Sequence, residues 1–193
     1  DAQYLLKDER VRFVSFIGSE AVGWEISRNV SPGVRYALEH GGTGTAIVCE
    51  DADLESAVPS ILRAAFYHAG QVCLSTQLVY VHSKIYDEFL AKITEQAKRL
   101  RTGDPLDPST DVGPIISQSE LDRIQTTVAQ AIAAGASIEI GAEVLDNSCY
   151  SPTILTETNR SMRVVSREIF GPVLCVQRYE DLKQTILEMN QSE

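Results

Sequence analysis

The sequence predicts an α/β protein built on an open, largely parallel sheet that is covered by helices. Short runs rich in β-branched and aromatic residues alternate with amphipathic runs of helical periodicity over most of the 193 residues. Several of the predicted strands are almost entirely apolar, which is typical of parallel strands buried on both faces. Glycine, proline and aspartate separate these runs, so that turns are expected between them.

The first predicted unit is a strand over residues 11–17, a helix over 20–30 and a second strand over 34–38. Gly18 and Ser19 join the first strand to the helix, and this geometry can place helix N-terminal N–H groups against a phosphate. One glycine and one serine fall well short of a dinucleotide-binding fingerprint, so an ordinary connecting turn is the simpler interpretation of these residues alone.

Glu39 follows the second strand and precedes the glycine pair Gly41 and Gly42. We expect this strand to be buried, and a carboxylate at the end of a buried strand is a candidate for a shifted pKa. On its local pattern alone, a solvated glutamate at a turn is the simpler interpretation.

Cys73 lies on a connection between a predicted helix and a predicted strand. A strand over 45–49 precedes the helix, which Asp51 or Asp53 can cap and whose apolar stripe extends towards Gly70. A β-rich run over 77–81 follows. A thiol on such a connection can be both held and exposed, as a nucleophile requires. A lone cysteine is also commonly a small buried hydrophobe, and the local pattern leaves both interpretations open.

The second half of the chain continues the alternation of helices and strands. Ser117 and Glu120 form a capping-box pattern at the start of one helix. The other predicted elements are a helix over 85–101, a loop over 102–114, strands over 137–140 and 173–176, and a last helix over 180–189. A further loop and the segment 152–155 lie between the two strands.

Composition excludes several classes of function. The net charge of −10 leaves no basic face for nucleic acid. We find no apolar run long enough to span a bilayer, so no membrane partner is expected. The four cysteines and three histidines have no metal-ligand spacing, and we therefore predict no metal site. Reduced thiols and a cytoplasmic location are the simplest expectation.

An ordered set of short motifs resembles the aldehyde dehydrogenase superfamily. The motifs cover nearly the whole chain, and they are Phe16-Ile17-Gly18-Ser19 with Val22-Gly23, Leu38-Glu39-His40-Gly41-Gly42, Asp51-Ala52-Asp53-Leu54, Gly70-Gln71-Val72-Cys73, Gly103-Asp104-Pro105 and Glu168-Ile169-Phe170-Gly171-Pro172. Each motif alone would be weak evidence, but their common order and spacing make the resemblance strong.

The resemblance implies a catalytic role for two residues. Cys73 is similar to the family nucleophile, whose thiolate attacks an aldehyde to give a thiohemiacetal and, after hydride transfer to a nicotinamide, a thioester. Glu39 is similar to the general base that activates the water hydrolysing this thioester. The implied reaction is oxidation of an aldehyde to a carboxylic acid with NAD or NADP as cofactor.

The resemblance also implies cofactor-binding residues. Gly18 and Ser19 are similar to pyrophosphate contacts, Glu168 to the carboxylate that holds the nicotinamide ribose, and Phe170 to the ring that packs near the nicotinamide. A small-molecule aldehyde is the implied substrate, and the full-length protein is expected to be a homo-oligomer.

The domain interpretation follows from the same resemblance. Residues 1–39 are similar to the last strand–helix unit of the cofactor-binding domain, and residues 40–193 to a catalytic domain that is incomplete at its C-terminus. We therefore expect a fragment that has little activity by itself.

Departures from the family pattern lie beside the implied base, because His40 replaces a usual leucine and Thr43 a usual lysine.

Three alternative functions stay open. A CoA-acylating aldehyde dehydrogenase would generally lack Glu39. A non-catalytic domain could retain the fold for structure or assembly. A cysteine hydrolase would need a histidine partner, for which the candidates are His40, His68 and His82.

Overall fold

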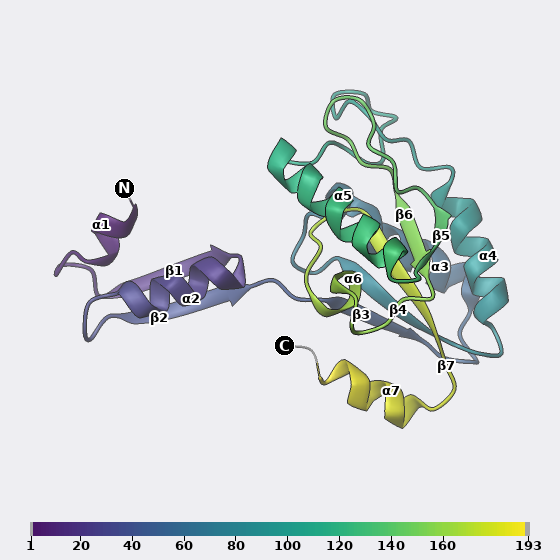
Figure 1. The fold of residues 1–193 in the computed structure, drawn as a ribbon, viewed down its shortest axis with the longest axis horizontal. Coiled ribbons are helices and arrows are strands. Elements are labelled where there is room, and N and C mark those ends of the chain that lie inside the picture. The colour runs from purple at the N-terminus through teal and green to yellow at the C-terminus, as the bar shows by residue number, and fades with distance from the viewer. Residues whose placement is uncertain (1, 192–193) are drawn as a thin grey trace. The chain divides into compact units, whose positions relative to one another are not determined.

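The computed structural model describes residues 2–191. The chain divides into two compact units, residues 1–42 and 43–193 (Figure 1). The helix α1 (Ala2–Leu6) begins the first unit. A parallel pair of strands follows, β1 (Phe13–Gly18) and β2 (Arg35–His40), which are joined by the helix α2 (Glu20–Asn29). The predicted strand–helix–strand order is therefore confirmed for this segment.

The first unit is less buried than expected. Gly23 is the buried residue of α2, and β2, including Glu39, is largely exposed. The expectation that Glu39 ends a buried strand is therefore wrong. Two strands and one helix bury too little surface to enclose both faces of a sheet. Large apolar side chains are exposed here as a result, including Phe13, Ile17, Trp24 and Tyr36.

The second unit is built on a five-stranded sheet with the order β3-β4-β7-β6-β5. Its strands are β3 (Gly44–Val48), β4 (Thr76–His82), β5 (Ser137–Ile140), β6 (Thr153–Thr156) and β7 (Val173–Tyr179). Four of them are parallel, and β5 pairs antiparallel to β6 at one edge. The predicted open and largely parallel sheet is confirmed.

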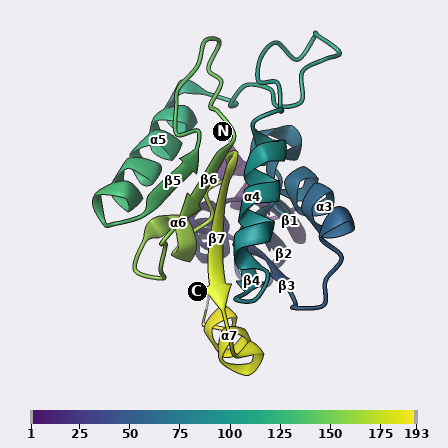
Figure 2. The ribbon, with the colours of Figure 1, turned by 90° about the vertical axis from the view of Figure 1, so that its right-hand side faces the viewer.

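Helices cover both faces of this sheet (Figure 2). The helices α3 (Leu54–Phe66) and α4 (Tyr86–Ala97) pack together on one face, and α5 (Gln118–Ala133) and α6 (Arg163–Ser166) lie on the other. The last helix, α7 (Leu182–Met189), follows β7. Valine, leucine and isoleucine of the central strands form the core between the helical layers.

Two predicted helix starts are confirmed. Asp53 caps α3 by accepting a hydrogen bond from the backbone N–H of Glu55 at 3.1 Å. Ser117 caps α5 by accepting from the N–H of Glu120 at 3.3 Å. Within residues 2–191, no helix has the length and apolar character needed to cross a membrane.

Candidate active site

The segment that carries Cys73 is not the simple end of a helix. The α3 helix ends at Phe66, and a single 3₁₀ turn, η1 (Tyr67–Gly70), follows it. His68 and Ala69 have φ values of 50° and 55°, and Gly70 has 67°. Left-handed conformations cost free energy for residues with a Cβ atom, so surrounding contacts must hold this turn.

Cys73 is exposed just beyond this turn. The backbone N–H of Ser75 donates to the carbonyl of Val72 at 2.9 Å, which bends the chain around the cysteine before β4 begins. The structure therefore excludes the interpretation of Cys73 as a buried hydrophobe. By contrast, Cys149 and Cys175 are buried, and burial raises the pKa of both thiols, that of Cys175 to about 12.

The Gln71 side chain anchors the same segment from one side. Its Nε2 donates to the carbonyl of Pro114 at 3.1 Å, and its Oε1 accepts from the N–H of Ile116 at 2.9 Å. These bonds tie the residues before Cys73 to the loop that precedes α5. The motif around the cysteine contains Gln71, but its local pattern gave no indication of these partners, which lie more than forty residues away along the chain.

Gly70 packs against a second segment, which contains Gly171. A Cβ atom placed on Gly70 would lie 2.1 Å from the carbonyl oxygen of Gly171. Glu168 and Phe170 belong to this second segment, and Phe170 has a φ of 51°. The structure thus brings the backbone that precedes Cys73 against the backbone that follows Phe170.

Glu168 and Phe170 differ in exposure. Glu168 is partly buried, and Phe170 is 36% exposed although the neighbouring Ile169 is 1% exposed. The guanidinium of Arg123 on α5 donates to the Ile169 carbonyl and pairs with Glu120 at 2.7 Å. The Glu120 carboxylate therefore forms an ion pair with Arg123.

The remaining candidate residues lie in the first unit. Ser19 is the N-cap of α2, and its hydroxyl makes no capping hydrogen bond. Gly18 precedes it at the end of β1, where a Cβ atom would lie 2.6 Å from the ring of Phe16. Glu39 lies opposite Ile17 in β2 and is exposed. Gly18, Ser19 and Glu39 thus share one unit, while Cys73, Glu168 and Phe170 share the other.

His40 occupies a tight position within the first unit. A Cβ atom on Gly23 would lie 1.9 Å from its Nε2, and its ring packs edge-on against Trp24 at 5.3 Å. This Nε2 is buried and has no hydrogen-bond partner among the described residues. His40 therefore places a buried ring nitrogen against the backbone of Gly23.

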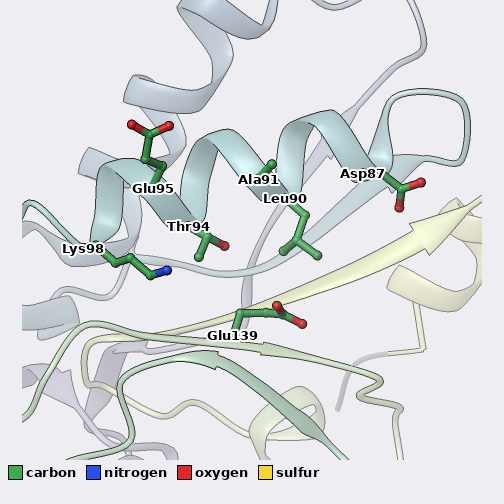
Figure 3. Close-up of a pocket in the computed structure, with 7 residues that line it drawn as sticks. All are labelled: Asp87, Leu90, Ala91, Thr94, Glu95, Lys98 and Glu139. Atoms are coloured by element: carbon green, nitrogen blue, oxygen red, sulfur yellow. The ribbon is translucent and has the colours of Figure 1, made fainter.

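A shallow cavity of about 380 Å³ lies elsewhere, between α4 and β5. Figure 3 shows Leu90 and Thr94 of α4, and Lys98 directly after it, on the side of the helix that faces Glu139. This cavity is lined by none of the predicted site residues. Within residues 2–191 there is also no cluster of three or more histidine, cysteine or acidic side chains that could hold a metal ion.

Comparison with models of known families identifies the class of protein that has this fold and this cysteine segment. The model of the aldehyde dehydrogenase family matches residues 2–193. The chain belongs to the aldehyde dehydrogenase family, as its motifs predicted.

Several curated relatives are similar over nearly the whole chain. The 3-sulfolactaldehyde dehydrogenase of Priestia megaterium is 39% identical over 191 residues, which are 99% of this chain and 40% of that protein. The succinate-semialdehyde dehydrogenase [NADP(+)] of Mycobacterium avium is 37% identical over 185 residues, 94% of this chain and 39% of that protein. The chain spans about two fifths of the length of the curated relatives it matches.

Solved structures agree in fold. The betaine aldehyde dehydrogenase of Staphylococcus aureus, in complex with NAD+, superimposes with a TM-score of 0.94 at 32% identity. The match covers 98% of this chain and 39% of that one.

Proposed function

We propose that this chain carries the nucleophile segment of an NAD(P)+-dependent aldehyde dehydrogenase, which oxidises an aldehyde to a carboxylic acid. The observation that carries the proposal is the exposed Cys73 beside a strained turn that two other segments hold in place. Such a turn can present a thiolate at a constant position without burying it. The succinate-semialdehyde relative is named for NADP(+), and the betaine aldehyde relative is solved with NAD+, so both cofactors are candidates.

Cys73 would act as the nucleophile. Its thiolate attacks the aldehyde carbon, a C–S bond forms, and the carbonyl oxygen becomes an oxyanion. In this proposal the backbone N–H of Cys73 donates a hydrogen bond to that oxyanion. One solved betaine aldehyde dehydrogenase structure has a BME-modified cysteine, which supports the presence of a reactive thiol in this family.

Glu39 would act as the base in the second half of the reaction. After oxidation, the substrate is held on Cys73 as a thioester. The Glu39 carboxylate removes a proton from a water molecule, the water oxygen attacks the thioester carbon, and the C–S bond breaks to release the acid. The exposure of Glu39 keeps it accessible to water.

The described residues fit a dinucleotide cofactor at two places. The first N–H groups of α2 lack intrahelical acceptors, and the Ser19 hydroxyl is not used for capping, so both can donate to a pyrophosphate. Glu168 would hold the ribose hydroxyls, and the partly exposed ring of Phe170 would pack near the nicotinamide. When bound, the nicotinamide supplies the hydride acceptor for the oxidation.

The larger framework is part of the same proposal. We propose that the first strand–helix segment belongs to the cofactor-binding domain, that the rest belongs to the catalytic domain, and that the whole protein is a cytoplasmic homo-oligomer. The isolated chain is expected to have little activity by itself, because it spans about two fifths of its relatives.

The test is an aldehyde panel with NAD+ or NADP+ on the protein that carries this chain, followed through the absorbance of the reduced dinucleotide. Cys73→Ala should abolish turnover, whereas Cys49→Ala, which removes the other exposed thiol, should retain it. Turnover that survives Cys73→Ala would refute the assignment. A requirement for CoA would instead identify an acylating enzyme.

A further inference from the structure

Gln77 is a buried amide within an apolar strand. It lies on β4, four residues after Cys73, and is 5% exposed. The residues that follow it in the strand, Leu78 and Val79, are buried apolar side chains of the core. A buried amide in such surroundings costs free energy unless its donors and acceptor are all satisfied.

The side-chain hydrogen bonds of Gln77 all go to one distant segment. Its Oε1 accepts from the N–H of Ile169 at 2.7 Å, and its Nε2 donates to the carbonyls of Arg167 at 2.7 Å and Val164 at 3.0 Å. Two of these three partners, Arg167 and Ile169, flank Glu168. The backbone on either side of that carboxylate is thus bonded to the strand that follows the nucleophile.

A second side chain, that of Arg123, also bonds the peptide groups beside Phe170. The Ile169 N–H is bonded to Gln77, and the Ile169 carbonyl accepts from Arg123 at 2.5 Å. Phe170 follows with its left-handed φ of 51°, a conformation that a residue with a Cβ atom adopts only when its surroundings impose it. The contacts of Ile169 supply that constraint.

We propose that Gln77 is a positioning residue, which sets the Glu168–Phe170 segment relative to Cys73. Because β4 leads directly out of the cysteine loop, this side chain links the position of the nucleophile to the position of the residues proposed to hold the cofactor. The expected effect on cofactor binding rests on the proposed function. The expected effect on the position of the Glu168–Phe170 segment rests only on the hydrogen bonds.

The test compares Gln77→Met with Gln177→Met. Methionine has a similar size and shape to glutamine but cannot replace these hydrogen bonds. Gln177 lies on the neighbouring strand β7, and its amide also bonds a loop, donating to the carbonyl and hydroxyl of Thr158 at 3.0 Å. It is therefore a matched control that removes a comparable amide from the same unit without touching the 164–170 segment.

Three measurements on the protein that carries this chain separate positioning from general destabilisation. Backbone hydrogen exchange over 164–170 should accelerate about tenfold or more in Gln77→Met, because the Ile169 N–H and the carbonyls of Val164 and Arg167 lose their partner and the segment opens more often. The KM for NAD+ or NADP+ should rise by about tenfold while the rate of Cys73 alkylation stays within about twofold of the unmodified protein. Gln177→Met should change none of the three.

Each outcome is decisive. Unchanged exchange over 164–170 in Gln77→Met would overturn the proposal, whether or not the protein oxidises aldehydes. Faster exchange with an unchanged dinucleotide KM would also overturn it, because the segment would then be held without effect on the cofactor. Activity that survives Cys73→Ala would refute the proposed function separately. The exchange result would then still test whether Gln77 holds the 164–170 segment.

Discussion

Gly70 and Gly171 meet backbone to backbone, so closely that a Cβ atom on Gly70 would lie 2.1 Å from the Gly171 carbonyl oxygen. This contact holds the turn before Cys73 against the segment after Phe170. Gly70 also has a φ of 67°, so the position demands glycine for two independent reasons.

Gly70→Ala should therefore destabilise the second unit by more than the strain of a left-handed alanine would alone. We expect the free energy of unfolding to fall by about 3 kcal/mol, because the strain of a left-handed alanine adds to a backbone collision. Gly135→Ala is the matched control, since Gly135 has a φ of 107° but open space around its Cβ position. Its loss should be smaller, about 2 kcal/mol, because only the strain of the backbone conformation remains. Equal losses in urea unfolding would show that the contact with Gly171 has no energetic weight.

The four thiols should react in two groups. Cys49 and Cys73 are exposed, whereas Cys149 and Cys175 are buried with raised pKa values. In the folded protein, N-ethylmaleimide should modify the exposed pair rapidly and the buried pair only on unfolding, as peptide mass spectrometry would show. Rapid labelling of Cys175 in the folded state would contradict the described core.

Alkaline pH should destabilise the fold through Cys175. Burial raises the pKa of its thiol from 9.0 to about 12. Between these values the unfolded chain releases this proton and the folded chain retains it, so the free energy of unfolding falls as the pH rises. Urea unfolding from about pH 8 to about pH 11 should show this decline, and Cys175→Val should make the decline shallower. Parallel pH profiles for the two proteins would exclude this thiol as a cause.

Replacing His40 with leucine should stabilise the first unit. The substitution removes a buried Nε2 atom that has no partner among the described residues, and it keeps an apolar contact with Trp24 and Gly23. We expect a gain of about 1 kcal/mol, because a buried unsatisfied polar atom costs free energy of this size. A lower midpoint of thermal unfolding for His40→Leu would show that the imidazole makes a favourable interaction.

The repeating pattern of the chain predicted the fold well, because hydrophobic periodicity reports directly on strands and helices. The parallel central strands, the Asp53 and Ser117 caps and the strand–helix order were all predictable in this way. The exposed character of β2 was not, since the residue pattern of a strand does not show whether another layer covers it.

The site was predictable only as a set of motifs. The contacts that hold it join residues far apart in the sequence, as Gln71 does with Pro114 and Gln77 with Ile169. Gln77 offered one local signal, a single amide leading into an otherwise apolar strand. No local pattern indicates which backbone groups such an amide will meet, because tertiary packing decides that.

The most direct test of the central claim is to trap the reaction on Cys73. Glu39→Gln in the protein that carries this chain should still allow attack on an aldehyde and oxidation, but should slow the hydrolysis that follows. With aldehyde and NAD+ or NADP+, peptide mass spectrometry should then detect the acyl group as a thioester on Cys73. The same protein with Cys73→Ala should show no adduct. An acyl group on Cys49, or no adduct in spite of continued aldehyde oxidation, would contradict the account.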